Sequence, residues 1–141
     1  MAITGGCLCG KLRYQVDGEL SGAQNCHCEI CRRAHGAAFG TFTVARKKDF
    51  RWLQGEEELR NYKSSSGFSR QFCPNCGSQV TTLEDWNPKG ITIAAGSLDN
   101  HVDVKVEGHM YTGSKATWFE ITDDLPQAEQ WPTGLGPSQS E

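Results

Sequence analysis

The chain has 141 residues, 37% of them hydrophobic, and a formal net charge of −3 at pH 7. This length suits one domain with a hydrophobic core of its own. No apolar run approaches the roughly 18 residues that a membrane span needs, and the negative charge does not favour binding to a nucleic-acid backbone. The sequence therefore predicts one globular domain that binds neither a membrane nor a nucleic acid.

The start of the chain has neither the basic nor the apolar stretch of a secretory signal, so we expect a cytoplasmic protein. In a reducing compartment, cysteines bind metal ions more often than they form disulfides. The chain has seven cysteines, an odd number that cannot pair completely. We therefore interpret them as metal ligands.

Short segments rich in β-branched and aromatic residues, some with alternating polarity, predict β-strands along most of the chain. In chain order these segments are residues 11–16, 39–45, 78–83, 91–96 and 102–108, with clusters of Gly and polar residues between them. A helical pattern competes in residues 55–63, where we expect a helical turn at most. The expected fold is all-β, with antiparallel sheets and few or no helices.

The composition changes after Thr122, where Pro, Gly, Ser and acidic residues become frequent. Such a segment has too few apolar residues to form a packed core. We therefore expect the folded domain to cover residues 5–125, and residues 126–141 to form a surface strap that ends in a loose tail.

Two pairs of cysteines lie far apart in the chain. The first, Cys7 and Cys9 in CLCG, would place both side chains on the same face of a strand, with Cα atoms about 6.5–7 Å apart. The second, Cys73 and Cys76 in CPNCG, has the spacing of a zinc knuckle, in which Gly77 permits a positive φ after the turn. Each pair can supply half of a tetrahedral site.

Three further cysteines, Cys26, Cys28 and Cys31, lie within six residues in CHCEIC. The first two share one face of an extended segment, and a following turn brings Cys31 to them. His27 then points to the opposite face, so we expect a hydrogen-bonded packing residue rather than a ligand. If a fourth protein ligand closes this site, His35 is the residue that we expect to supply it.

Structural zinc sites have four protein ligands, whereas catalytic sites typically have three and keep one position open. Spacing alone leaves open which cysteines share an ion. Combining the first pair with Cys26 and Cys28 would leave the other three cysteines on separated segments. We therefore favour a closed site formed by Cys7, Cys9, Cys73 and Cys76. The remaining three, Cys26, Cys28 and Cys31, would form an open site.

A zinc ion with three thiolate ligands is a poor Lewis acid, but it binds a soft sulfur ligand well. A substrate thiol at the open position would lose its proton and remain nucleophilic. Arg32 and Arg33 follow directly and could bind a substrate carboxylate, although a solvated surface pair is an equally ordinary role. Asp99 and His109 are candidate proton acceptors, with turn capping as the alternative.

Five segments carry a resemblance to a known family. In chain order the segments are GGCLCGKLRY, CHCEICRRAHGAAF, FCPNCGSQV, AGSLD and HMYTGSKATWFEITDDLPQ. They resemble the glutathione-dependent formaldehyde-activating enzyme (GFA) family, whose domain also occurs in centromere protein V. The resemblance covers residues 5–129 and implies packed antiparallel sheets called a β-tent, with two zinc ions per chain. It implies a structural zinc held by Cys7, Cys9, Cys73 and Cys76. It also implies a catalytic zinc held by Cys26, Cys28 and Cys31.

The reaction that this resemblance implies is the condensation of glutathione with formaldehyde to S-hydroxymethylglutathione, formally a carbon–sulfur lyase reaction in reverse. We therefore expect a zinc-dependent enzyme of the carbon–sulfur lyase type that binds a small thiol such as glutathione at the three-cysteine zinc. The alternative is a non-catalytic, zinc-stabilised binding module in which the second zinc site is closed.

Overall fold

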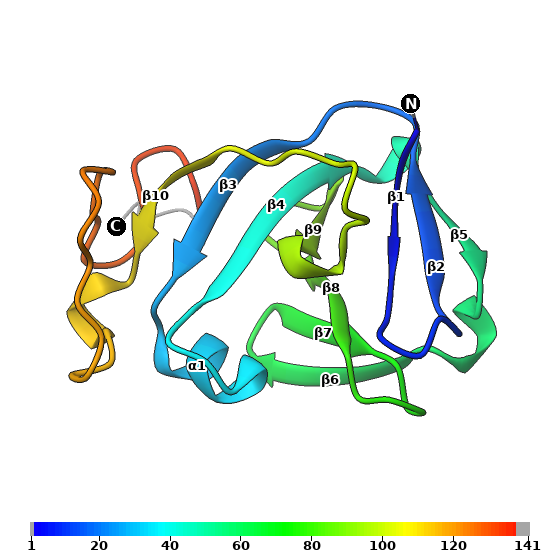
Figure 1. Ribbon diagram of the computed structural model, residues 1–141, viewed down its shortest axis with the longest axis horizontal. Helices are drawn as coiled ribbons and strands as arrows, with labels where there is room; N and C mark the ends of the chain where they lie inside the picture. Colours follow the sequence, from blue (N-terminus) through cyan, green and yellow to red (C-terminus); the bar gives the residue numbers. More distant parts are fainter. Residues whose placement is uncertain (1, 138–141) are drawn as a thin grey trace.

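The computed structural model of the chain describes residues 2–137, which form two β-sheets, one α-helix and four short 3₁₀ turns (Figure 1). The smaller sheet has the strand order β1-β2-β5, and the larger one has the order β10-β3-β4-β9-β8-β7-β6. The strands of the smaller sheet are Ile3–Gly6, Arg13–Val16 and Phe50–Gln54. The larger sheet consists of β3 (Ser21–Cys26), β4 (Gly40–Arg46), β6 (Arg60–Ser65), β7 (Phe68–Phe72), β8 (Gln79–Glu84), β9 (Gly90–Ala94) and β10 (Val106–Met110).

The main core lies between the two sheets. The alternation in residues 11–16 places Leu12, Tyr14 and Val16 on one face, where each is at most 1% exposed. These side chains pack in one cluster with Val80 of β8 and Ile93 of β9. The small sheet is therefore held against the large one by the apolar face of β2, and β1, which precedes the first cysteine pair, is fixed with it.

The prediction of a mainly β fold is confirmed, with two local corrections. The segment 102–108 becomes a strand only at Val106, where it begins to pair with Ala23 of β3. This pair is also parallel, whereas every other strand pair among the described residues is antiparallel. The sheets are therefore antiparallel as expected, apart from the pair of β3 and β10.

The helix α1 (Glu29–His35) follows β3 directly and carries the third cysteine of CHCEIC into place. Cys28 is its N-cap residue, and Cys28 Sγ accepts a hydrogen bond from the backbone N–H of Cys31. Gly36 ends the helix in the left-handed region, at a φ of 59°. The helical turn expected within residues 55–63 is a 3₁₀ turn, Glu56–Glu58, and β6 follows it. No helix in residues 2–137 is long and apolar enough to cross a membrane.

The C-terminal segment lies along β10 (Figure 1). The backbone N–H of His109 donates to the carbonyl of Pro126, and that of Ala128 donates back to His109, each at 2.9 Å. The N–H of Tyr111 donates to Gln130 in the same way, at 3.0 Å. The segment is therefore hydrogen-bonded to the sheet edge through residue 130. The domain boundary at residue 125 stays a prediction, and residues 138–141 of the expected tail lie outside the described part of the chain.

Candidate metal centres

The first cysteine cluster joins two segments of the chain that are far apart in sequence, with 64 positions between Cys9 and Cys73. The sulfur atoms of Cys7, Cys9, Cys73 and Cys76 all lie within 4.8 Å of one another. The Cys7–Cys9 and Cys9–Cys73 sulfur distances are 3.6 Å and 3.8 Å. Four sulfurs around zinc at the usual bond length would be about 3.8 Å apart, because this is the edge of the tetrahedron that such bonds define. The four thiols therefore fit a zinc ion.

Two turns, rather than a strand and a turn, bring these cysteines together. The expectation that Cys7 and Cys9 lie in a strand is wrong, because β1 ends at Gly6 and a tight turn follows, with Gly10 at a φ of 84°. The backbone N–H of Leu12 donates to Cys7 Sγ at 3.2 Å. Such an N–H stabilises the thiolate form that binds metal.

The second half of this site is the predicted knuckle. Gly77 has a φ of 80°, and its N–H donates to the carbonyl of Cys73 at 2.7 Å. The N–H of Leu8 in the first turn donates to the hydroxyl of Ser78, which follows the knuckle, at 3.0 Å. The two turns are therefore linked by a hydrogen bond as well as by the cluster of sulfurs.

The second cluster consists of Cys26, Cys28 and Cys31, whose sulfurs also lie within 4.8 Å of one another. Cys26 ends β3, Cys28 caps α1, and Cys31 lies in the first turn of that helix. No further His, Cys, Asp or Glu of residues 2–137 joins this group. The chemistry of three thiols at this spacing suits a zinc ion that keeps one position for another ligand.

The three thiols share hydrogen bonds that make their proton affinities unequal. Hydrogen bonds from Cys26 and Cys31 lower the pKa of Cys28, while the same cluster raises the pKa of Cys26. The lowered pKa favours the thiolate form of Cys28, and the thiolate is the form that binds metal.

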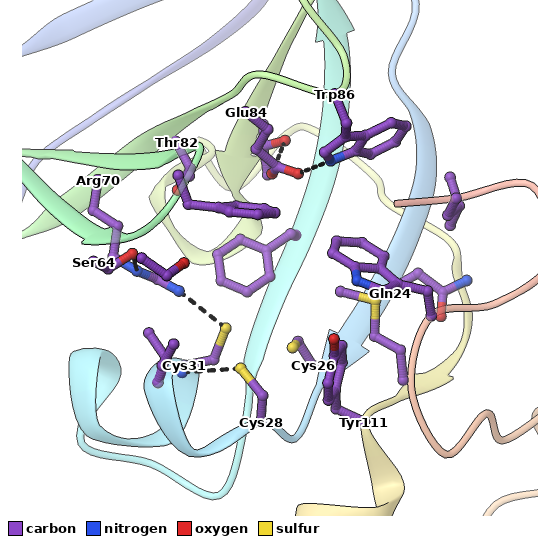
Figure 2. A pocket seen from close by; sticks show the side chains of 18 of the residues that line it. Gln24, Cys26, Cys28, Cys31, Ser64, Arg70, Thr82, Glu84, Trp86 and Tyr111 are labelled. Carbon is purple, nitrogen blue, oxygen red and sulfur yellow. Dashed lines mark hydrogen bonds between the residues drawn. The ribbon is translucent and has the colours of Figure 1, made fainter. Parts of the chain in front are cut away.

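A cavity of about 200 Å³ lies beside this cluster, with all three cysteines in its wall (Figure 2). The wall is formed by all seven strands of the large sheet, α1 and the C-terminal segment. Five of its residues are aromatic: Phe42, Phe68, Trp86, Tyr111 and Trp131. The four-cysteine cluster has none of its members in this wall.

Trp131 is central to the aromatic side of the cavity. Its ring stacks on Phe68 with 6.1 Å between the ring centroids, and meets Trp86 and Tyr111 edge-on at 5.8 Å and 5.9 Å. Trp131 also packs against the buried group that contains Cys26, Cys31 and Phe42. The C-terminal segment therefore closes one side of the cavity with a side chain that the sequence analysis assigned to a surface strap.

Two charged side chains, Arg70 and Glu84, line the cavity within the described residues. Arg70 is 7% exposed, and Figure 2 shows its guanidinium between Ser64 and Cys31. Its Nε donates to Ser64 Oγ at 3.1 Å, and Nη2 donates to Cys31 Sγ at 3.3 Å. Nη1 is buried and has no hydrogen-bond partner among the described residues. Arg70 can thus stabilise a thiolate of the cluster, and one of its donors has no partner among the described residues.

Glu84 lies farther along the cavity, beside Trp86 (Figure 2). Its two carboxylate oxygens accept hydrogen bonds from Trp86 Nε1 and Thr92 Oγ1, each at 2.6 Å. Both oxygens already have a partner in the wall. Glu84 therefore holds the Trp86 ring in place. Of the two charged residues, Arg70 is the one with a nitrogen that has no hydrogen-bond partner among the described residues.

The two arginines predicted as carboxylate contacts lie outside the cavity wall. Arg33 is exposed and pairs with Glu29 one turn earlier, at 2.9 Å. Arg32 is half-buried, and its Nε has no hydrogen-bond partner among the described residues. A role in binding a substrate carboxylate stays a prediction for both, while Arg70 is the arginine that lines the cavity.

The other predicted polar residues also lie away from the cavity wall. Asp99 pairs with Arg13 at 2.6 Å, and hydrogen bonds from Arg13 and then Thr4 lower the pKa of Asp99 to about 2. Asp99 thus ties the loop after β9 to the small sheet. His35 lies outside the sulfur cluster and its cavity, and stacks edge-on against Phe42.

His27 and His109 form a buried chain behind the three-cysteine cluster. His27 Nε2 and His109 Nδ1 are 2.8 Å apart, and His109 Nε2 lies 3.0 Å from a carboxylate oxygen of Asp123. Burial lowers the pKa of His27 to about 4, so this ring is neutral near pH 7. The expectation of a hydrogen-bonded packing residue at His27 is confirmed.

The chain was compared with known protein families, curated proteins and solved structures. The chain matches the profile of the family described as "Glutathione-dependent formaldehyde-activating enzyme" (GFA) over residues 2–114. A Halomonas elongata protein named "Putative glutathione-dependent formaldehyde-activating enzyme" is 26% identical over 128 residues, which cover 86% of this chain and 82% of that protein.

Two further comparisons agree with this match. An uncharacterized lyase of Schizosaccharomyces pombe is 34% identical over 76 residues, which cover 54% of this chain and 53% of the lyase. A crystal structure of a Rhodobacter sphaeroides protein superposes with a TM-score of 0.62 at 26% identity, covering 76% of this chain and 99% of that one. With four-fifths of its length matched to the family profile, the chain belongs to the GFA family.

Proposed function

We propose that this protein is a zinc-dependent enzyme of the carbon–sulfur lyase type that binds a small thiol at Cys26, Cys28 and Cys31 and joins it to an aldehyde carbon. The observation that carries the proposal is a difference between the two cysteine clusters. The three-cysteine cluster lies in a cavity wall, whereas the other cluster has four sulfurs, a complete tetrahedral set. The first arrangement is suited to binding a ligand and the second to holding the fold.

A zinc ion held by the three cysteines would supply a fourth position at which a substrate thiol ionises and stays nucleophilic. The cavity supplies the surroundings of that step. Cys26 and Cys31 are 3% and 5% exposed, so the reacting sulfur would be sheltered from bulk water. Arg70 lies against the same cluster and places a permanent positive charge where the thiolates accumulate negative charge.

Arg70, which lines the cavity, is the residue whose positive charge we assign to the aldehyde oxygen. As the sulfur lone pair forms the carbon–sulfur bond, the carbonyl π electrons move to the oxygen, which accepts the proton that the thiol lost. Thiol and aldehyde add to one product, with no other reactant. A fixed positive charge near the oxygen stabilises the negative charge that develops there. In the reverse direction the same contacts would serve carbon–sulfur cleavage.

The family name supplies the first candidate substrates, glutathione and formaldehyde. The proposal includes two zinc ions per chain, a zinc-binding domain over residues 5–125 and the β-tent arrangement that the resemblance implies. It also includes a cytoplasmic location, which the seven free cysteines support because a reducing compartment keeps thiols available for metal.

The uncatalysed addition of a thiol to formaldehyde is fast, so the test must measure exchange at equilibrium. In magnetisation-transfer NMR, we expect the zinc-loaded protein to raise the rate at which formaldehyde hydrate exchanges with the hemithioacetal that formaldehyde forms with the thiol. The increase should be proportional to the protein concentration. Glutathione and ethanethiol should be compared. The Cys31→Ser variant should lose the effect, and the exposed Trp118→Leu variant should keep it.

An exchange rate equal to that of buffer at every protein concentration, with both thiols, would contradict the enzymatic proposal. The non-catalytic binding module would then be the better interpretation.

A further inference from the structure

The charges in the cavity do not match those of glutathione. Glutathione carries two carboxylates and one ammonium group at neutral pH, whereas Arg70 is the one cationic side chain in the wall within the described residues. Glu84 is the one carboxylate, and its oxygens already accept two hydrogen bonds. A second ligand carboxylate inside the cavity would be buried without a cationic partner, which carries a high desolvation cost.

The size of the cavity points in the same direction. Its volume is about 200 Å³, below the roughly 300–1,000 Å³ of pockets that take drug-sized ligands. A tripeptide would extend beyond this space while its thiol reached the cysteines. The cavity can instead enclose a ligand with a single compact body attached to its sulfur.

The wall nearest the sulfurs indicates the chemistry of that body. Phe42, Met110, Tyr111 and Trp131 pack in one group with the three cysteines. Phe68 and Trp86 extend this surface through their ring contacts with Trp131. Aromatic and thioether walls of this kind favour a hydrocarbon or aromatic ligand, which gains from desolvation and from edge or offset ring contacts.

We propose that the thiol taken by this cavity is small and largely apolar, with an aromatic or branched hydrocarbon body and at most one oxygen-bearing group, which Arg70 receives. This inference rests on the proposed function, because it assumes that the ligand sulfur reaches the ion held by Cys26, Cys28 and Cys31. It departs from glutathione in the body of the thiol and leaves the sulfur chemistry unchanged.

The test uses the full chain with cobalt in place of zinc, because a fourth thiolate strengthens the sulfur-to-metal charge-transfer absorption. Benzyl mercaptan, ethanethiol and glutathione are titrated separately, and each affinity is expressed per thiolate concentration. We expect benzyl mercaptan to bind at least about tenfold more tightly than glutathione, with ethanethiol between them.

Variants of the wall provide a second measurement. Trp131→Leu removes the central ring, and Phe68→Leu makes a smaller change to the same surface. Each should weaken benzyl mercaptan by about threefold to tenfold and change ethanethiol by less than about twofold, because only the larger body reaches these rings. The matched control is Trp118→Leu, since Trp118 is 72% exposed and lies outside the cavity wall.

The outcomes are separable. If glutathione binds as tightly as benzyl mercaptan, or within about threefold of it, the apolar-thiol inference is overturned and the thiol-binding site stands. If none of the three thiols changes the cobalt spectrum, the proposed function fails, and this inference fails with it. If wall variants and the control weaken all thiols equally, the aromatic body does not occupy the cavity and the inference is again overturned.

Discussion

Arg70 Nη2 lies 3.3 Å from the sulfur of Cys31, although the two residues are 39 positions apart in the chain. The contact joins β7 to the first turn of α1. It places a fixed positive charge against a cluster of thiols, with a second nitrogen, Nη1, left without a partner. This relationship makes Arg70 the first residue to vary.

Arg70→Gln should weaken thiol binding to the cobalt protein, because it removes a charge-assisted contact to the sulfur cluster. The loss should be of the order of 1.5–3 kcal/mol, or roughly tenfold to a hundredfold in the dissociation constant. The control is Arg33→Gln, whose side chain is exposed and paired with Glu29. Equal losses in both variants would favour the predicted role of the arginines that follow Cys31 and contradict that of Arg70.

We expect two zinc ions per chain when the protein is purified without chelator. Each cysteine cluster has its sulfurs within 4.8 Å, and four thiolates or three bind zinc tightly near neutral pH. Metal analysis by mass spectrometry against protein concentration measures the ratio. A reproducible ratio near one would show that the three-cysteine cluster does not retain zinc, and thiol binding at that position would lose its basis.

Cys73→Ser should destabilise the fold more than Cys31→Ser. The four-cysteine site joins turns whose members Cys9 and Cys73 are 64 positions apart, so metal binding there closes a long loop. Cys31 lies within six residues of its partners and constrains only β3 and α1. Thermal melts of both variants, with zinc content measured alongside, provide the comparison. Equal losses in melting temperature would contradict the assignment of a structural and an open site.

Gly136→Ala should disturb the cavity, because a Cβ atom at Gly136 would overlap the indole ring of Trp131. Gly134 is the matched control: both glycines have a φ of 88°, but a Cβ at Gly134 meets no atom within 4 Å. Both variants therefore share the backbone cost of about 1–2 kcal/mol, and only one displaces the ring. We expect Gly136→Ala alone to weaken benzyl mercaptan, by about fivefold. Indistinguishable variants would show that Trp131 does not shape the thiol site.

The division of the cysteines could be predicted because it depends on local spacing and on a count. Cys73 and Cys76 form a knuckle whose turn residues are adjacent in sequence, and Gly77 has the positive φ that the pattern requires. The triplet Cys26, Cys28 and Cys31 is similarly self-contained. The error at Cys7 concerned backbone conformation only, because a turn after β1 and a strand both bring the two sulfurs together.

Two of the strands that lie outside the predicted segments, β3 and β6, depend on their neighbours. Residues 21–26, SGAQNC, contain no β-branched or aromatic residue, yet they form β3 because β4 and β10 pair with them on both sides. Residues 60–65 are mostly exposed and polar, and they form β6 through pairing with β7. Strand propensity is a property of the pleated surface as much as of the segment itself.

The cavity was beyond prediction for the same reason. Arg70 and Glu84 lie in β7 and β8, and their approach to the cysteines depends on strand order and register. Trp131 lies in a segment whose composition indicates a loose surface strap, and backbone pairing with β10 brings it into the wall. No local motif marks any of the three.

The three cysteines beside the cavity come from six consecutive residues, whereas the walls come from seven strands and the C-terminal segment. The two parts can therefore diverge independently in evolution. A substitution at Phe68 or Trp131 alters the space available to a ligand and leaves the cysteines in place. Gene duplicates could acquire different substrates while each keeps the same CHCEIC signature. Under the proposed function, that signature would identify a shared metal site, whereas the cavity wall would determine which thiol each protein binds.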